Sequence, residues 1–347
     1  MKNKYIYISI VFVLSISGCT DLLVGSPPPT TPTAVFDELW HDFDQRYALF
    51  DVYNVNWDSL YHIYRPHLTD QTEDSVLAKT IDTLLRNLHD RHIGFYAYTK
   101  YKSFSFTYGE GYLDSAIGFD FVKVSSYYLR STAQSMGFGQ IIYGFINDSI
   151  GYIYLPTFTE DSGTYGWAGY FGAVLDSLQS AKGLIVDIRG NSGGTQSNFI
   201  SISSHFFSKT QNVLYNQLRN GAGHEDFSAA EPITISSSGK PYTKPIVLIT
   251  DRFTVSAGEW FTLAMKLLPN VTHIGDTTSG AFSGRLDREL GNGWVYSMSI
   301  EKITNTNGVS YEGKGIPPEI TIHLAPHYRV SFSKDTTLDR AIELLSK

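Results

Sequence analysis

Cysteine is almost absent from this chain, because Cys19 is the only one among its 347 residues. A single cysteine cannot form a disulfide within the chain, so the fold must be stable without one. Charge is also modest, since charged residues make up 18% of the sequence and the formal net charge is −7. Beyond the N-terminus the sequence has no cluster of lysine and arginine. We therefore expect no nucleic-acid partner.

The apolar run near the N-terminus is too short to span a bilayer comfortably. Two lysines stand among the first four residues, residues 5–16 are mostly apolar, and Gly18 precedes Cys19. This pattern resembles a bacterial lipobox and predicts a signal peptide over residues 1–18, with lipidation of the Cys19 sulfur. The alternative is an ordinary secretory signal in which Cys19 is incidental. Because an exported chain with one cysteine has no internal disulfide to form, we expect an exported lipoprotein anchored in the cell envelope by lipid.

The rest of the chain predicts an α/β protein with three further parts. Residues 19–33 are rich in proline and predict an extended tether. Residues 34–93 contain apolar side chains at helical spacing and predict a helical subdomain, in which Asp70 is the expected N-cap of the last helix. Residues 94–347 predict an α/β core.

Within that core, strand-like and helical segments alternate, which is typical of a largely parallel sheet. The segment 208–244, rich in Gly, Ser and Asn, predicts a long surface excursion. The expected strands are residues 118–124, 141–145, 152–155, 184–188, 246–250, 271–274 and 294–303. The expected helices are residues 166–179, 196–207, 257–268 and 336–345.

Two segments carry the chemistry, and each follows a predicted strand. Residues 187–194 form a glycine-rich turn whose backbone N–H groups are free to bind an anion, and residues 254–259 place Ser256 at the start of a helix. A nucleophile beside such N–H groups is what acyl transfer requires. Taken singly, each segment is also explained as an ordinary strand-to-helix turn, with Ser256 as a plain N-cap.

A serine nucleophile needs a base, and His92 is the histidine that the sequence places at a domain junction. It ends the helical subdomain just as strand-like sequence begins. On position alone it also reads as a surface or capping histidine. The sequence contains no H-E-x-x-H pattern, so we expect neither a zinc site nor another cofactor.

Four ordered motifs together resemble the serine peptidases of the C-terminal-processing and tricorn type. They are Leu88-x-Asp90-x-His92, Asp187-x-Arg189-x-Asn191-x-Gly193-Gly194, Ser256-Ala257-Gly258-Glu259 and Glu312-Gly313-Lys314-Gly315-Ile316-Pro317-Pro318. The resemblance covers about residues 34–345 and implies an N-terminal helical subdomain with a crotonase-like core of ββα units. Residues 100–147 are too few for the PDZ domain that many C-terminal-processing members insert.

The resemblance also places the chain within that group. C-terminal-processing members carry a lysine twenty-five residues after the nucleophile, where this chain has Ala281. Lys266, ten residues along the same helix as Ser256, is roughly 15 Å away at 1.5 Å per residue. The sequence thus resembles the tricorn and retinoid-binding-protein-like branch, in which a histidine is the base.

This branch implies a role for each matching residue. Ser256 would be the nucleophile and His92 the base, and Glu312 would orient and charge-balance the histidine. Gly193 or Gly194, together with Ala257, would donate to the oxyanion. The tricorn pattern has a serine before the histidine, where this chain has Arg91. A direct Arg91–Glu312 ion pair is one replacement, and a rearranged Ser–Lys dyad with Lys314 is the alternative to His92.

The expected function is that of a serine endopeptidase acting on peptides or unfolded protein segments. Two alternatives stay open at this point. One is a non-catalytic protein that binds a peptide or an apolar ligand on the same fold. The other is a different α/β hydrolase, such as an esterase or a lactamase-like enzyme.

Overall fold

The computed structural model describes residues 30–99, 103–107, 119–160, 163, 165–323 and 334–347. The predicted signal peptide (residues 1–18), Cys19 and most of the predicted tether (residues 19–33) lie outside the described residues. Helix α2 (Pro32–Arg46) begins within the last two tether positions, where Pro32 occupies the first turn, a site that tolerates its missing N–H. None of the helices in the described part is both long and apolar enough to cross a membrane.

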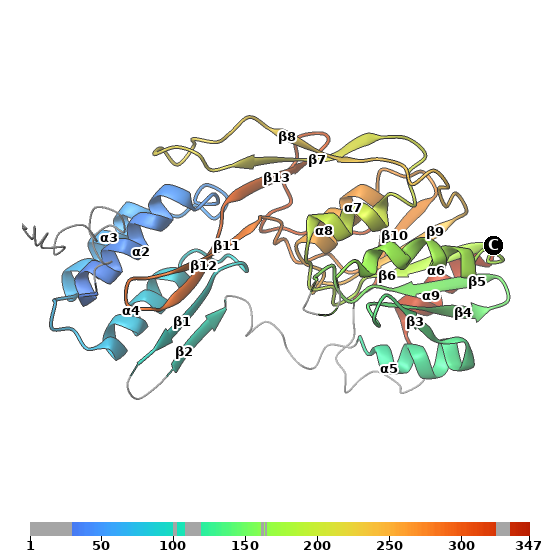
Figure 1. Cartoon of the computed structure of the whole chain (residues 1–347), viewed down its shortest axis with the longest axis horizontal. Helices are drawn as coiled ribbons and strands as arrows, with labels where there is room; N and C mark the ends of the chain where they lie inside the picture. Colours follow the sequence, from blue (N-terminus) through green and yellow to red (C-terminus); the bar gives the residue numbers. More distant parts are fainter. Residues whose placement is uncertain (1–29, 100–102, 108–118, 161–162, 164, 324–333) are drawn as a thin grey trace, which may run out of the picture.

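The chain forms two lobes, and the N-terminal lobe packs helices on a small sheet (Figure 1). The helices are α2, α3 (Trp57–Tyr64) and α4 (Asp74–Arg86). The sheet has the order β11-β12-β1-β2, formed by Arg285–Glu289, Val295–Ser299, Gly94–Tyr98 and Ser103–Thr107. One hydrophobic cluster joins helical residues such as Phe36 and Leu84 to Phe95 and Trp294 of the sheet region. The division predicted at residue 93 thus separates segments that share one core.

Helix α4 does not begin as the sequence predicted. Its N-cap is Glu73, and the Glu73 side chain makes no capping hydrogen bond. Asp70, the expected N-cap, instead accepts a hydrogen bond from the Thr33 hydroxyl in the first turn of α2. The Asp70 carboxylate therefore links the segment before α4 to α2 and does not cap α4.

The C-terminal lobe is built on a seven-stranded mixed sheet of order β14-β10-β9-β6-β5-β4-β3. The five strands β14, β10, β9, β6 and β5 each pair in parallel with the next one in this order. β4 pairs antiparallel with both β5 and β3. In chain order the strands are Gln134–Met136 (β3), Ile141–Asn147 (β4), Ile150–Tyr154 (β5), Gly183–Asp187 (β6), Ile246–Thr250 (β9), Val271–Gly275 (β10) and Ile320–Thr321 (β14).

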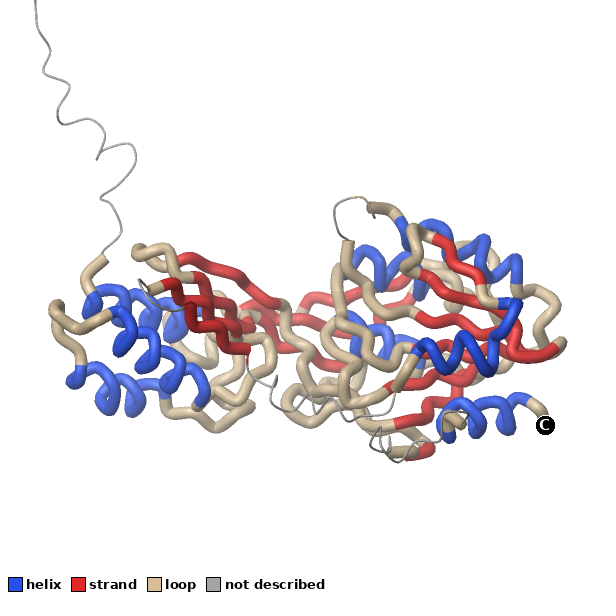
Figure 2. Tube along the Cα trace, turned by 90° about the horizontal axis from the view of Figure 1, so that it is seen from below, coloured by secondary structure: helices blue, strands red, loops and turns tan. Residues whose placement is uncertain are grey.

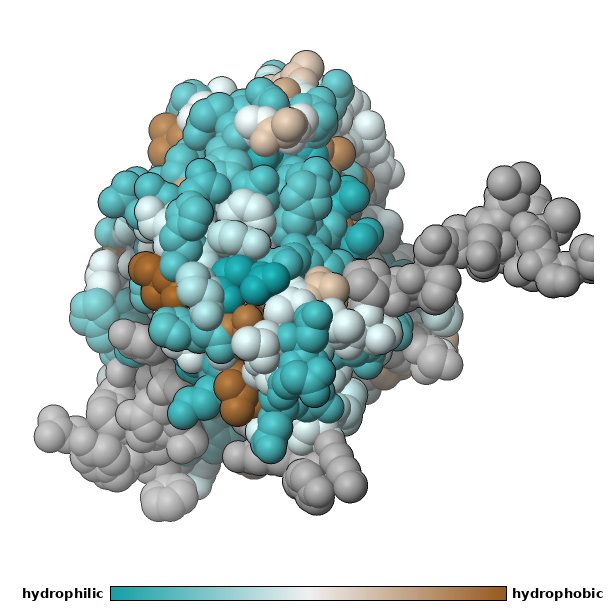
Figure 3. Space-filling model, turned by 90° about the vertical axis from the view of Figure 1, so that its left-hand side faces the viewer, coloured by the Kyte–Doolittle hydropathy of each residue, from teal (hydrophilic) through white to brown (hydrophobic). Residues whose placement is uncertain are grey.

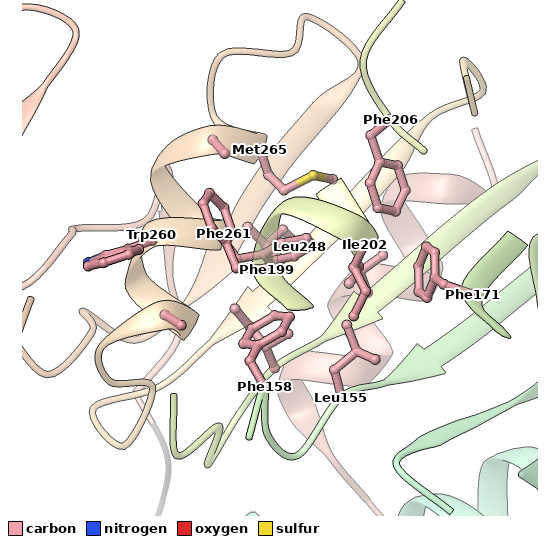
Figure 4. Packing of buried hydrophobic residues seen from close by; sticks show 14 of the residues in the cluster. Leu155, Phe158, Phe171, Phe199, Ile202, Phe206, Leu248, Trp260, Phe261 and Met265 are labelled. Carbon is pink, nitrogen blue, oxygen red and sulfur yellow. The ribbon is translucent and has the colours of Figure 1, made fainter. Parts of the chain in front are cut away.

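Helices cover both faces of this sheet (Figure 2). On one face lie α6 (Phe171–Ser177), α7 (Gln196–Ser203) and α8 (Ala257–Met265), which share a cluster with alternate strand residues. On the other face α9 (Thr336–Leu345) packs against a second cluster. Figure 4 shows the packing of the first cluster, which includes Leu155, Phe158, Phe171, Phe199, Ile202, Phe206, Leu248, Trp260, Phe261 and Met265. The buried helix α8 is thereby held rigidly at its place on the sheet.

The predicted surface excursion at residues 208–244 contains two strands. β7 (Gln211–Leu218) pairs antiparallel with β8 (Glu231–Ile235) and with β13 (Glu301–Asn305). This sheet runs along the top of Figure 1 from one lobe to the other. Near its far end Arg219 donates to the Asp44 carbonyl (3.0 Å), and His224 contacts the Asp44 carboxylate (2.7 Å). The β7–β8 hairpin is thus a strap that ties the C-terminal lobe to α2.

Two further strand predictions need correction. The strand predicted at residues 118–124 is helical from residue 121 on, because α5 (Phe121–Lys123) leads into a π-helical turn over Val124–Leu129. The Asp120 side chain accepts from the Val122 N–H and starts the helix. The strand expected at residues 294–303 is divided between β12 and β13, which belong to different sheets. The predicted α/β class with an N-terminal helical region is confirmed.

The outer end of the N-terminal lobe is mostly hydrophilic, with small separate apolar patches (Figure 3). Exposed apolar side chains in this lobe include Ile63 and Val76. Scattered residues of this kind are normal on a protein surface, so they point to no partner.

Candidate active site

The two motif segments lie side by side at one edge of the seven-stranded sheet. Strands β6 and β9 are parallel neighbours, with Asp187 opposite Ile249, so the turns that follow them emerge together. The Val255 N–H donates to the Asn191 carbonyl (3.0 Å) and links the turns directly. A Cβ placed on Gly193 would lie 2.6 Å from the Ser256 Cβ and 3.2 Å from its Oγ. The serine therefore sits against the glycine turn.

A buried network of ion pairs holds the glycine turn where it leaves strand β6. Arg189 contacts Asp187 (2.6 Å) and Asp335 (2.8 Å), and the guanidinium and the Asp187 carboxylate are fully buried. Asp335 also caps α9 by accepting from two of its N–H groups. The charge of Arg189 is thus balanced by structural partners, and its role is to hold the turn in place.

Ser256 is the N-cap of α8 but has an unusual backbone. Its φ of 53° and ψ of −122° differ from the extended conformation that an N-cap residue normally adopts. A positive φ costs free energy in a non-glycine residue, so the surrounding contacts must hold it. Its N–H donates to the Ala281 carbonyl (2.9 Å) and to the Glu259 carboxylate (3.2 Å).

Glu259 is a buried clamp whose role the sequence analysis did not identify. Besides Ser256, its carboxylate accepts from the Thr278 hydroxyl (2.6 Å) and from the N–H groups of Gly280 (2.7 Å) and Ala281 (2.8 Å). Burial raises the pKa of Glu259 to about 7, while the four hydrogen bonds act in the opposite direction. The signal for this role was its position three residues after an N-cap serine, where a carboxylate reaches back to the N-cap N–H.

The predicted oxyanion donors differ in how their N–H groups are used. The Gly193 N–H donates to the Asn191 side-chain oxygen (2.9 Å). For the N–H groups of Gly194 and Ala257, the described part of the chain supplies no acceptor. Gly194 has a φ of 143°, and a Cβ there would lie 2.0 Å from the Phe158 carbonyl carbon. Of the two glycines, Gly194 is therefore the one with an available donor.

His92 lies in a buried group with Asp90 and Glu312. One ligand atom from each of these three residues lies within 4.8 Å of the others, and the His92 Nδ1 is 3.9 Å from an Asp90 oxygen. The His92 backbone N–H donates to that same oxygen (2.8 Å). Burial lowers the pKa of His92, while Asp90 acts to raise it and Arg285 to lower it further. Burial thus favours the neutral form of the imidazole.

Glu312 is held by backbone rather than by an arginine. Its carboxylate accepts from the N–H groups of Phe282 (3.0 Å) and Ser283 (3.0 Å). Burial raises the pKa of Glu312 well above its usual range, and the nearby charges of Asp90 and Glu259 add to this effect. Arg91 points elsewhere, because its guanidinium donates to the Arg252 carbonyl (3.2 Å) and to the Ser279 hydroxyl. The suggested Arg91–Glu312 ion pair does not form.

One peptide group connects the two halves of the site. The Ala281 carbonyl accepts from Ser256, and the N–H of the same peptide, on Phe282, donates to Glu312. The group of His92, Asp90 and Glu312 is thereby placed next to the serine turn. Lys266 pairs with Glu319 (3.2 Å), and Lys314 is exposed.

Comparison with known proteins identifies the family of the chain. The family model of peptidase family S41 matches residues 149–322, half of the chain, and that of the tricorn protease C1 domain matches residues 28–80. The chain belongs to peptidase family S41. The predicted resemblance to the C-terminal-processing and tricorn type is thereby confirmed, and the family is one of hydrolases.

Individual S41 relatives cover different parts of the chain. The carboxy-terminal processing protease CtpA of Bacillus subtilis is 27% identical over 188 residues, which is 54% of this chain and 38% of the relative. The tricorn protease of Thermoplasma volcanium is 29% identical over 237 residues, 67% of this chain and 21% of the relative. A peptidase candidate from Parabacteroides merdae has a solved structure with a TM-score of 0.80 at 27% identity, covering 92% of this chain and 98% of the other. The chain thus spans well under half the length of CtpA and of the tricorn protease.

Proposed function

We propose that this S41 member is a serine endopeptidase in which Ser256 is the nucleophile and His92 the general base. The observation that carries the proposal is the link through the Ala281–Phe282 peptide, which sets Ser256 and Glu312 on opposite ends of one planar unit. The substrates would be peptides or unfolded protein segments, as the family implies. No cofactor takes part in the proposed reaction.

In the first step the Ser256 Oγ attacks the carbonyl carbon of the scissile peptide, and His92 takes the hydroxyl proton. The negative charge that develops on the carbonyl oxygen is stabilised by the N–H groups of Gly194 and Ala257. His92 then gives its proton to the leaving nitrogen as the C–N bond breaks, leaving an acyl-enzyme on Ser256. A water, activated by the same imidazole, releases the acid and restores the serine.

Asp90 and Glu312 would hold the imidazole for this task. A base in acyl transfer must be neutral to accept a proton, and burial lowers the pKa of His92 in that direction. An Nδ1–H that points to the carboxyl groups leaves the Nε2 lone pair free for the serine. The carboxyl groups also stabilise the imidazolium that forms during attack.

The proposal extends to the cell envelope and to a lipid on Cys19, on the strength of the N-terminal sequence. Replacing Cys19 by serine should leave the leader uncleaved by the lipoprotein signal peptidase. The chain should then remain longer by 18 residues in mass spectrometry and lose labelling by an alkyne fatty acid. Labelling that persists in Cys19→Ser would contradict the lipid assignment.

A fluorogenic peptide library with the purified protein tests the activity. The wild-type chain should cleave internal bonds, and both Ser256→Ala and His92→Ala should reduce turnover by several orders of magnitude. Circular dichroism should show that both variants keep the wild-type fold. If the wild-type chain binds peptides without cleaving any, the same fold serves as a binding protein and the proposal fails.

A further inference from the structure

The group of Asp90, His92 and Glu312 has an unusual balance of charge. Two carboxyl groups face one imidazole, and Asp90 and Glu312 are 0% and 2% exposed. Among the described residues, no lysine or arginine forms an ion pair with either carboxyl group. Arg91 is occupied by Arg252 and Ser279, and Arg285 pairs with Asp287 (2.7 Å). Buried carboxylates without a cation are costly.

Two polar atoms of this group are also unsatisfied. Asp90 Oδ2 and His92 Nδ1 are buried and have no hydrogen-bond partner among the described residues. The other Asp90 oxygen is fixed by the His92 N–H (2.8 Å). Asp90 also lies beside the buried Tyr47 hydroxyl, which likewise has no hydrogen-bond partner among the described residues. A nitrogen and carboxylate oxygens that converge in this way are the donor set that zinc prefers.

We propose that Asp90, His92 and Glu312 bind a divalent cation of the zinc type, and that the ion inhibits the peptidase. Zinc bonds of about 2.0–2.2 Å place tetrahedral ligand atoms roughly 3.4 Å apart. The three ligand atoms already lie within 4.8 Å of one another, so modest side-chain rotations close the site. A fourth position remains for water, as in zinc sites with three protein ligands.

Inhibition follows from the two nitrogens of the imidazole, and this step rests on the proposed role of His92 as the base. A zinc ion takes the Nδ1 lone pair, so the single proton of the neutral ring must sit on Nε2. A ring with Nε2–H cannot accept the proton of Ser256. The ion and the Nδ1 proton therefore exclude each other, and only the ion-free form is active.

Isothermal titration of the Ser256→Ala protein with zinc tests the site without any need for activity. The protein should carry no polyhistidine tag. We expect one saturable site, and tetrahedral d–d absorption when cobalt replaces zinc. His92→Ala and Glu312→Gln, made in the Ser256→Ala background, should weaken binding by at least roughly 100-fold, since even outer-shell changes cost about 10–100-fold. His224→Ala is the matched control, because it removes a histidine that contacts a carboxylate elsewhere (2.7 Å).

A second readout applies to the wild-type chain if the variants do not fold. Zinc should protect His92 from diethyl pyrocarbonate in peptide mass spectrometry and leave His224 reactive. Peptidase activity should fall at the same zinc concentration and return with a chelator. No saturable binding to Ser256→Ala, or equal binding in the His92→Ala and His224→Ala variants, would overturn the metal site. Binding at this site in a chain that never cleaves peptides would instead refute the peptidase proposal and leave the site in place.

Discussion

Ser256 and Glu312 contact opposite ends of a single peptide group. The Ser256 N–H donates to the Ala281 carbonyl (2.9 Å), and the adjoining Phe282 N–H donates to the Glu312 carboxylate (3.0 Å). Because a peptide group is planar and rigid, this contact fixes the distance between the serine turn and the carboxyl that faces His92. Glu259 holds the same segment from the other side through Gly280 and Ala281. The segment 278–283 is therefore the scaffold on which both halves of the site are aligned.

The contact between Gly193 and Ser256 predicts that a methyl group at position 193 disables the enzyme. In Gly193→Ala the new Cβ would lie 2.6 Å from the Ser256 Cβ at a φ of 75°. Displacement of the nucleophile by about 1 Å should reduce kcat/KM by roughly 100-fold. Gly139→Ala is the matched control, because Gly139 has a φ of 85° but no heavy atom within 4 Å of the added Cβ. Both variants share the cost of the positive φ, so the larger loss of Tm that calorimetry should show for Gly193→Ala reports the cost of the clash alone. Equal activity in the two would contradict the contact.

The clamp predicts that Glu259→Gln keeps the fold but misaligns the serine. All four donors point at the carboxylate oxygens, and the amide NH₂ of glutamine would face some of them. We expect kcat/KM to fall by about 10–100-fold, measured with a fluorogenic peptide. Glu343→Gln, at an exposed position in α9, is the control and should keep wild-type activity. A fully active Glu259→Gln would show that the serine turn holds itself.

The same residue predicts how pH acts on the protein. Burial raises the pKa of Glu259 from 4.5 to about 7. Between these two pH values the folded chain therefore holds a proton on Glu259 that the unfolded chain has released. The protonated Glu259 side chain therefore favours the folded state fully below pH 4.5, and this stabilisation is lost as the pH rises through about 7. Activity should change in the opposite sense, because the clamp needs the carboxylate. The pKa of His92 is lowered, so the part of the pH–activity profile that reports its titration lies below about pH 6.5. A limb near pH 7 in kcat/KM should thus disappear in Glu259→Gln, and its persistence would assign it to another group.

How far the sequence predicted the structure depended on whether an element is determined locally. The helix over residues 336–345 and the buried strands β6 and β9 were predicted within a residue or so, because their apolar patterns are local. Strands β7 and β8 were missed, since β7 is largely polar and is defined by pairing with β13 more than eighty residues later. The apolar residues before Val124 looked like a strand, and the Asp120 cap that starts a helix there was overlooked.

The candidate site divides in the same way. The motifs and their order in the sequence identified the serine turn and the glycine turn as parts of one site, and the structure places the two turns in contact. The partners of Arg91 could not be predicted, because Arg252 and Ser279 reach it only through the tertiary fold. The engaged N–H of Gly193 was likewise hidden, since it depends on the rotamer of Asn191. The catalytic roles of His92 and Glu312 stay predictions.

Arg91 is expected to position His92 rather than to balance charge. Its guanidinium bonds join the segment before His92 to the loops at Arg252 and Ser279. Loss of hydrogen bonds from a charged group costs about 1.5–3 kcal/mol. Arg91→Ala should therefore reduce kcat roughly tenfold and lower Tm, with little change in KM. Arg86→Ala, which removes an exposed ion pair with Asp82 (3.1 Å), should leave kcat unchanged. If both variants behave alike, Arg91 has no positioning role.

Covalent labelling with a fluorophosphonate tests the central claim most directly. Such probes phosphonylate a serine only when a neighbouring base and oxyanion donors activate it. Intact-mass and peptide mass spectrometry of the wild-type chain should show one adduct, on Ser256, that forms far more slowly in His92→Ala and is absent in Ser256→Ala. No adduct on a folded wild-type chain, an adduct on another serine, or an unchanged rate in His92→Ala would contradict the assignment of Ser256 and His92.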